Sequence, residues 1–280
     1  MRNVTCDEIT SAVERLCVVA ATVLPPALGI LLECASEAES SPVGASALCD
    51  IVDNFKFAAE SGLPICQDTG MAVVFAGIGQ DVHITGGLFE DAVNEGVRRG
   101  YENGRLRKSV VADPFRRVNT GDNTPAVLHT RLIAGESIEL DVAPKGFGSE
   151  NMSAMRMFLP TDGIDAVEEF VVETVRSAGS NPCPPTVIGV GLGGTVEMAA
   201  LLAKRALLRP PDRHGADRFY ADAERRILAK INSLGIGPQG FGGDFTSVAV
   251  SIETYPTHIA GLPCVVNVGC HATRHAHCMI

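Results

Sequence analysis

The sequence of 280 residues contains no apolar run that is long enough to cross a membrane. Its most apolar stretch, residues 17–32, is interrupted by Pro25 and Pro26, whereas a membrane-spanning helix needs about 20 apolar residues. We therefore expect two short helices in this stretch and no membrane partner. The first residues, MRNVTCDE, also lack the basic start and the apolar core of a signal peptide.

The chain is poor in positive charge. It has 23 Lys and Arg against 33 Asp and Glu, which gives a net charge of −10. Proteins that hold nucleic acid through phosphate contacts have the opposite balance, so this composition argues against a nucleic-acid partner. A small anionic substrate stays compatible with it, because local arginines can dominate a site.

The nine cysteines are too few and too scattered for the dense, even disulfide framework of a small secreted domain. They favour a reducing compartment, and we expect a cytoplasmic protein. Three of them stand in constrained loops: Cys66 in PICQDTG, Cys183 in NPCPP and Cys270 in NVGCH. Their separations of 117 and 87 positions exclude a zinc ribbon or a ferredoxin-type run, so the fold would have to bring them together.

Each of these loops also has a structural interpretation. Pro64 and Gly70 bracket a tight turn, in which Cys66 could simply be a small buried apolar residue. Around Cys183, prolines with a fixed φ leave the thiol little freedom of direction, and such a rigid thiol suits a metal. Three similar loops in one chain favour the functional interpretation.

Apolar spacing predicts an α/β fold, which we expect to be one domain, 1–280, with a mixed sheet flanked by helices. Thr5 and Glu8 predict a capping box at the first helix. Further helices are expected after Pro26 and over residues 43–60, 88–101, 162–178, 196–208 and 219–234. Strands are expected over 71–75, 82–84, 186–190, 246–252 and 264–268, and a hairpin over 126–133 and 137–142.

The residues GVGLGG at 189–194 match the dinucleotide-binding pattern G-x-G-x-x-G. That fingerprint requires an acidic residue at the end of a second strand about 20 residues later. Here the predicted helix is followed by Pro210, Pro211 and Asp212, and no such strand is evident. We expect these glycines to allow close packing of a helix on a strand.

Seven motifs in one order carry a resemblance over nearly the whole chain. They are CQDTG at 66–70, NTGDNTPA at 119–126, KGFGSEN at 145–151, CPP at 183–185, GLGGT at 191–195, GIGPQG at 235–240 and GCH at 269–271. This set resembles the iron-sulfur hydro-lyases that comprise class I fumarate hydratases and L-tartrate dehydratases, specifically their α subunit or N-terminal domain.

The resemblance implies that Cys66, Cys183 and Cys270 hold a [4Fe-4S] cluster with one open iron. Three thiolates for four irons leave a position at which a dicarboxylate substrate can bind, whereas a cluster with four cysteines is closed and suits electron transfer. The resemblance further implies that Arg107 binds a substrate carboxylate and that His258 contacts the substrate as an acid–base group.

The residues next to these positions have matching chemistry. Gln67 and Asp68 can hydrogen-bond the substrate, and Asp68 is a catalytic candidate. The glycine-rich loop around Gly148 offers backbone amides to an oxyanion. Roles for His271, His275, Cys264 and Cys278 stay open.

The expected reaction is the reversible hydration of fumarate to L-malate. L-tartrate dehydratase, or a hydro-lyase for another 2-hydroxy dicarboxylate, stays open, because Phe147 stands where the fumarase pattern usually has a small residue. A non-catalytic iron-sulfur redox protein and a dinucleotide-binding oxidoreductase are the alternatives from other classes.

The resemblance also implies a partner. The chain ends at Ile280, ten residues after Cys270, without the β portion that supplies the group moving the carbon-bound proton in the family. We expect a separate β subunit and an α2β2 assembly.

Overall fold

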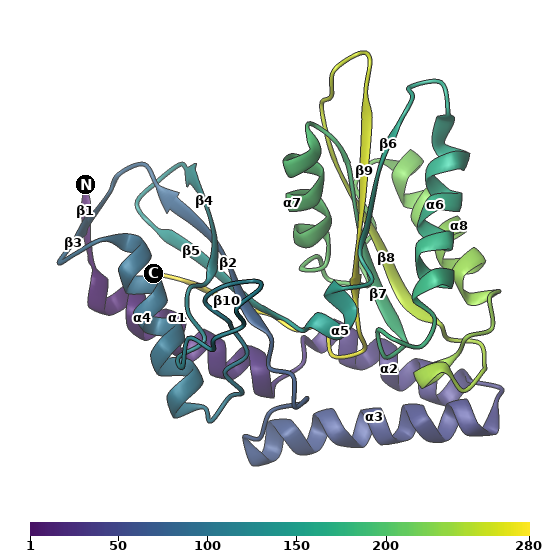
Figure 1. Cartoon of the computed structure of the whole chain (residues 1–280), viewed down its shortest axis with the longest axis horizontal. Coiled ribbons are helices and arrows are strands. Elements are labelled where there is room, and N and C mark those ends of the chain that lie inside the picture. Colours follow the sequence, from purple (N-terminus) through teal and green to yellow (C-terminus); the bar gives the residue numbers. More distant parts are fainter. The chain divides into compact units, whose positions relative to one another are not determined.

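The computed structural model describes all 280 residues, and the chain divides into two compact units (Figure 1). The first unit comprises Met1–Pro25, Phe57–Gly146 and Arg274–Ile280, and the second comprises Pro26–Lys56 and Phe147–Thr273. Each unit has a four-stranded mixed sheet with helices packed against it, which confirms the predicted α/β class. The assignment of 1–280 to one hydro-lyase domain stays a prediction.

The first unit is built on the sheet β10-β5-β2-β4. Its elements are β1 (Arg2–Thr5), α1 (Cys6–Thr22), β2 (Met71–Gly79), β3 (Val82–Thr85), α4 (Phe89–Asn103), β4 (Val127–Ile133), β5 (Ile138–Lys145) and β10 (Ala276–Met279). Helix α1 packs against α4 and β5. A Cβ atom at Gly96 would lie 2.6 Å from the Cβ of Val13, so glycine lets the two helices approach closely.

The start of α1 follows the predicted local chemistry. The Thr5 side chain accepts a hydrogen bond from the Glu8 backbone N–H, and the Glu8 carboxylate accepts one from the Thr5 N–H. This reciprocal capping box satisfies two donors that the first turn would leave without partners. Its two side chains are three residues apart, so the sequence alone could predict it.

The predicted hairpin over 126–133 and 137–142 is wrong. Strands β4 and β5 do not pair with each other, because β2 lies between them, parallel to β4 and antiparallel to β5. The connection passes around the end of β2, where Gly79 N–H donates to the Ser137 carbonyl. Strand β2 is almost entirely buried and takes partners on both edges, which outweighs the local turn signal. Along β5, the apolar residues Ile138, Leu140 and Val142 alternate with acidic ones and are fully buried.

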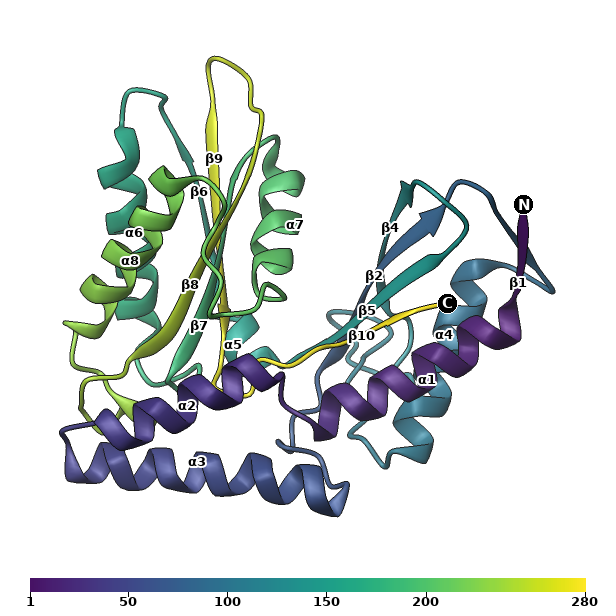
Figure 2. The ribbon, with the colours of Figure 1, turned by 180° about the vertical axis from the view of Figure 1, so that it is seen from behind.

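The second unit is built on the sheet β6-β9-β7-β8. Its elements are α2 (Pro26–Ala38), α3 (Pro42–Ser61), α5 (Phe147–Glu150), β6 (Ala154–Phe158), α6 (Gly163–Ala178), β7 (Thr186–Gly193), α7 (Val196–Ala206), α8 (Arg218–Asn232), a 3-10 turn (Pro238–Gly240), β8 (Ser247–Tyr255) and β9 (Leu262–Gly269). Helix α7 lies on one side of this sheet, and α6 and α8 lie on the other (Figures 1 and 2). The short elements β1, α5, β6 and β10 were not predicted.

The glycines of GVGLGG pack a helix against a strand, as predicted. A Cβ atom at Gly189 would lie 2.2 Å from the Ala203 carbonyl oxygen, and one at Gly191 would lie 2.0 Å from that of Ala199. Any larger residue would therefore push α7 away from β7. This contact accounts for the pattern without a nucleotide.

The apolar N-terminal stretch forms two helices rather than one. By length and composition alone, residues 6–38 could cross a membrane. Half of the most apolar 18-residue segment within this range is buried in the structure. The chain leaves the helical conformation between Thr22 and Pro26. The resulting helices have 17 and 13 residues, each shorter than the roughly 20 that a span needs.

Candidate functional site

The loop at residues 64–70 in the first unit is tightly folded immediately before β2. The Asp68 carboxylate accepts a hydrogen bond from the Gly70 N–H at 3.0 Å, which closes a turn around Thr69. Gly70 has φ +73°, and a Cβ atom there would lie 2.7 Å from the Lys145 backbone. Both the positive φ and the close approach of the Lys145 backbone therefore favour glycine at position 70. The Cys66 thiol is half-buried, 3.6 Å from the Gln67 amide oxygen.

Two buried side chains, those of Tyr101 and Arg274, donate hydrogen bonds to the backbone of this loop. The Tyr101 hydroxyl donates to the carbonyl oxygens of Thr69 at 2.8 Å and Gly70 at 3.1 Å. Burial raises the pKa of Tyr101, so the phenol stays protonated and remains a donor. The guanidinium of Arg274, itself buried, donates to the Asp68 carbonyl. Three consecutive carbonyl groups of the loop are therefore fixed by side chains.

The first unit brings Arg107 next to this loop. The buried Thr69 hydroxyl donates to the Arg107 carbonyl oxygen at 3.0 Å. The Arg107 side chain is exposed and makes no hydrogen bond or ion pair in the structure, whereas neighbouring Lys108 pairs with Glu102. Cys66, Gln67, Asp68 and Arg107 thus lie on two adjacent segments, with the arginine available to an anion.

The second unit brings Cys183 and Cys270 to the same end of its sheet. Cys183 precedes the first residues of β7, and Cys270 follows the last residue of β9. These strands are antiparallel, with Val187 opposite Gly269, so the start of one lies beside the end of the other. The two cysteines are 87 positions apart in the sequence, and the pairing of β7 with β9 brings their loops close together.

A direct contact connects the two cysteine loops. The His271 ring Nδ1 lies 3.0 Å from the Cys183 carbonyl oxygen, and Cys183 has the left-handed φ of +55°. Gln239 completes the bridge, since both its backbone N–H and its side-chain Nε2 donate to the Pro184 carbonyl, at 2.8 and 2.7 Å. Nε2 of Gln239 is also 3.2 Å from His271 Nδ1.

Gly148 lies at this same end of the second unit. It belongs to α5, and a Cβ atom there would be 3.7 Å from the carbonyl oxygen of Asn181 in the Cys183 loop. Glu150 of the same short helix accepts a hydrogen bond at 2.9 Å from the amide of Asn267, which lies on β9 three residues before Cys270. The glycine-rich segment, which forms the short helix α5, is therefore hydrogen-bonded to the strand that leads to Cys270 and lies beside the Cys183 loop.

His258 does not lie near Cys183 or Cys270 within this unit. It is in the exposed turn between β8 and β9, where its ring accepts a hydrogen bond from the Ala260 N–H. Cys270 follows the other end of β9, and eight residues of strand extend over about 26 Å. The GVGLGG turn also lies at the His258 end, because the Thr257 hydroxyl donates to the Gly194 carbonyl.

The cysteines differ in their capacity to bind a metal. Burial raises the pKa of Cys17 and Cys264 to about 12, so these thiols stay protonated and are poor ligands. Cys183 is exposed, while Cys66 and Cys270 are partly exposed, and all three stand in loops held by hydrogen bonds. Thiols that are accessible in this way can act as metal ligands. No group of three His, Cys, Asp or Glu side chains is arranged in the structure to hold a metal ion.

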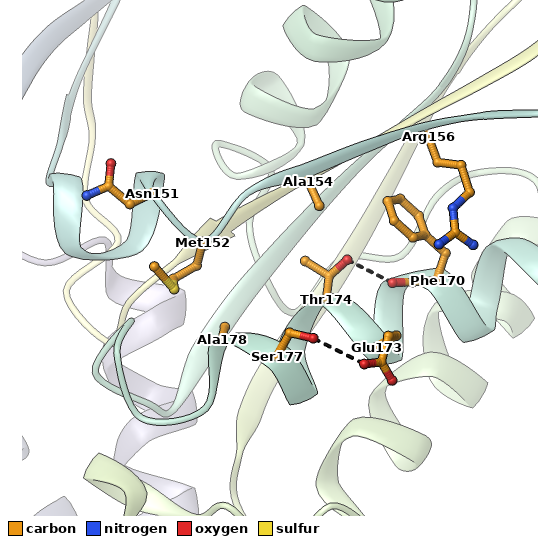
Figure 3. Close-up of a pocket in the computed structure, with 9 residues that line it drawn as sticks. All are labelled: Asn151, Met152, Ala154, Arg156, Phe170, Glu173, Thr174, Ser177 and Ala178. Carbon is orange, nitrogen blue, oxygen red and sulfur yellow. Dashed lines mark hydrogen bonds between the residues drawn. The ribbon is translucent and has the colours of Figure 1, made fainter.

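A cavity of about 360 Å³ lies between β6 and α6 (Figure 3). The Arg156 guanidinium stacks over the Phe170 ring there, 4.6 Å from its centroid. Its lining contains none of the predicted site residues.

Sequence reasoning missed several residues that build the two loops. Tyr101, Thr69 and Arg274 hold the Cys66 loop, Asn123 connects it to the Arg107 segment, and Gln239 holds the Cys183 loop. Asn123 and Gln239 fall inside the NTGDNTPA and GIGPQG motifs, but their hydrogen-bond partners lie outside these motifs. Tyr101 gave no signal, because its partners are more than 30 positions away.

The chain is similar to fumarate hydratases and to L(+)-tartrate dehydratase α subunits. Residues 10–279 match the family model described as fumarate hydratase. A provisionally named L(+)-tartrate dehydratase subunit alpha of Methanocaldococcus jannaschii is 40% identical over 274 residues, which cover 96% of each chain. The L(+)-tartrate dehydratase α subunits of Escherichia coli and Shigella boydii are each 30% identical over 278 residues, 98% of this chain and 91% of theirs.

Proposed function

Because the chain belongs to the fumarate hydratase family, we propose that it is the α subunit of an iron-sulfur hydro-lyase that converts fumarate reversibly to L-malate. The match over residues 10–279 carries this proposal, since it includes all seven motifs. The second candidate is L(+)-tartrate dehydration, which is favoured by the names of relatives that are 30–40% identical over nearly the whole chain. Both reactions add or remove water at a dicarboxylate.

The proposed cofactor is a [4Fe-4S] cluster held by Cys66, Cys183 and Cys270. When bound, such a cluster would supply an iron with an open position, a Lewis acid for a reaction in which hydroxide is a poor leaving group. The exposure of these thiols supports the choice. A redox cluster would need a fourth equivalent thiolate, and buried Cys264 is unsuited to that role.

The chain's own residues bind and orient the substrate in this proposal. Arg107 forms a two-pronged contact with one carboxylate, which suits its exposed guanidinium. Gln67 donates its amide hydrogens to the substrate, and Asp68 holds or moves a proton through its carboxylate. The Asp68 carboxylate accepts a hydrogen bond from the Gly70 N–H, and the Asp68 carbonyl accepts one from Arg274, so the carboxylate direction is set before substrate arrives.

Gly148 and His258 complete the proposed set on different grounds. The exposed backbone of Gly148, next to the Cys183 loop, suits a contact with substrate oxygen. His258 enters from the resemblance alone, as an acid–base group. Its position at the opposite end of β9 from Cys270 gives it the weakest structural support of the set.

A separate β subunit is the proposed partner. Relatives that cover nearly the whole of this chain are named as subunit alpha, and such a name implies a second kind of subunit. We propose that this partner supplies the group that moves the carbon-bound proton, in an α2β2 assembly located in the cytoplasm.

The experiment is an anaerobic assay of the chain co-expressed with its partner, after reconstitution with iron and sulfide. Fumarate, L-malate, mesaconate and L(+)-tartrate are compared at equal concentration. Preferred turnover of fumarate and malate supports the proposal, and preferred turnover of tartrate supports the second candidate. No turnover of any of them by a complex loaded with the cluster would overturn both.

A further inference from the structure

The GDNTPA segment at residues 121–126 has no assigned role in the chemistry above, yet it contains a buried asparagine that joins two loops of the proposed site. Asn123 has no exposed surface and adopts φ +64°, a conformation that L-residues rarely take. Burying a polar side chain and holding a left-handed backbone both cost free energy, so the hydrogen bonds of Asn123 must offset these two costs.

The Asn123 side chain uses both ends of its amide. Its Oδ1 accepts hydrogen bonds from the backbone N–H groups of Ser109 at 2.7 Å and Val110 at 3.2 Å. Its Nδ2 donates to the Gly70 carbonyl oxygen at 3.2 Å. One side chain thus fixes the segment that follows Arg107 relative to the loop that contains Asp68.

Thr69 makes a second connection between the same two segments. Only 1% of its surface is exposed, and its hydroxyl donates to the carbonyl oxygen of Arg107 at 3.0 Å. The Lys108 carbonyl is held as well, by the Asn119 amide at 2.9 Å. The backbone from Arg107 to Val110 is therefore held at four consecutive residues.

Nothing in the structure holds the Arg107 side chain itself. Its guanidinium is exposed and makes no hydrogen bond or ion pair, so its placement depends on the backbone beneath it. A long arginine side chain loses much conformational freedom when it binds. A fixed backbone reduces the number of positions that the guanidinium explores.

We propose that Asn123 and Thr69 are positioning residues for Arg107, which set its guanidinium relative to Gln67 and Asp68. This inference rests on the proposed function, in which Arg107 binds a substrate carboxylate. Because both residues act through Arg107, their removal costs affinity for the dicarboxylate only while the guanidinium is present.

Two substitutions remove the connections while keeping the local backbone conformation. Asn123→Gly keeps the left-handed conformation, which glycine adopts easily, and removes the side-chain hydrogen bonds to Ser109, Val110 and Gly70. Thr69→Val keeps the branched shape and removes the hydroxyl, while Thr69→Ser keeps the hydroxyl. The matched control is Thr10→Val, which also removes a buried 3.0 Å bond from a threonine hydroxyl to a carbonyl, that of Ala92, far from Arg107 in sequence.

Each variant is made with Arg107 and with Arg107→Met, and the co-expressed complex is assayed. With Arg107 present, Asn123→Gly and Thr69→Val should each raise KM for the preferred dicarboxylate about tenfold, with kcat changed less than about threefold. In the Arg107→Met background, the same substitutions should change KM by less than about twofold. Thr69→Ser should restore most of the wild-type KM, and Thr10→Val should leave KM unchanged.

A second readout does not depend on turnover. Hydrogen exchange of the Ser109 and Val110 amides should be faster in Asn123→Gly and unchanged in Thr10→Val, at a temperature where both variants are folded. Equal KM increases in the two Arg107 backgrounds, or unchanged exchange at these amides, would overturn the inference. A wild-type complex that turns over no dicarboxylate would overturn the proposed function, and the inference with it.

Discussion

The ring of His271 lies 3.0 Å from the carbonyl oxygen of Cys183, so the residue after Cys270 is attached to the other cysteine loop of the second unit. A carbonyl oxygen only accepts, so the ring nitrogen Nδ1 donates in this contact. The two cysteines are 87 positions apart, and this bond fixes their loops to each other through one side chain.

Gln239→Leu should loosen the two cysteine loops. The substitution keeps the backbone N–H bond to Pro184 and removes the Nε2 donor to the same carbonyl. Loss of one partly buried hydrogen bond should lower the free energy of unfolding by about 1–2 kcal/mol. Thermal unfolding measures this change, and iron loss in the presence of a chelator should be faster in the variant. If neither thermal unfolding nor the rate of iron loss changes, Gln239 does not stabilise the cysteine loops.

Cys66→Ser, Cys183→Ser and Cys270→Ser should each abolish nearly all of the iron-sulfur absorbance, because each removes one of three proposed thiolate ligands. The control is Cys49→Ser, which changes an exposed cysteine on α3 and should leave the absorbance intact. Wild-type absorbance in any one of the three variants would remove that cysteine from the ligand set.

Arg107→Ala should lower kcat/KM for the preferred dicarboxylate by an amount equivalent to about 2–5 kcal/mol, since a two-pronged charged contact is lost. The matched control is Arg105→Ala. Arg105 is also exposed, but no side chain connects its backbone to the Cys66 loop. Steady-state kinetics measures both variants. A larger loss in the Arg105 variant would assign carboxylate binding to that residue.

The stability of the protein should fall as the pH falls through the range in which His275 would be protonated in the unfolded chain. Burial lowers the pKa of His275, His277 lowers it further, and Asp141 opposes the change. An unfolded histidine has a pKa of about 6.5, so below that pH the unfolded chain binds the extra proton and is favoured.

His275→Met removes this titrating group, so its melting temperature should depend less steeply on pH than that of the wild type between about pH 6.5 and 5. The same slope in both proteins would show that other groups determine the acid sensitivity. The Nδ1 atom of His275 is buried without a hydrogen-bond partner, so no neighbouring acceptor stabilises a proton on it.

The sequence predicted the elements whose signals are local. The capping box of Thr5 and Glu8 acts over three residues. The alternation of Ile138, Leu140 and Val142 with acidic residues is equally local, and these three residues form the buried face of β5. The hairpin prediction failed because strand pairing depends on β2, whose residues lie 54 positions before their partners in β4 and 60 to 74 before those in β5.

The same division holds for the candidate site. The sequence by itself determined which residues have the required chemistry, because a tight turn around Cys66 and a proline-restricted Cys183 are local properties of the backbone. Only the tertiary structure decided which of them are neighbours. The antiparallel β7 and β9 bring the Cys183 and Cys270 loops together, and the same strand β9 separates Cys270 from His258. The amide of Asn123 reaches partners 13 and 53 positions away, and no periodicity in a sequence encodes a hydrogen bond over such separations.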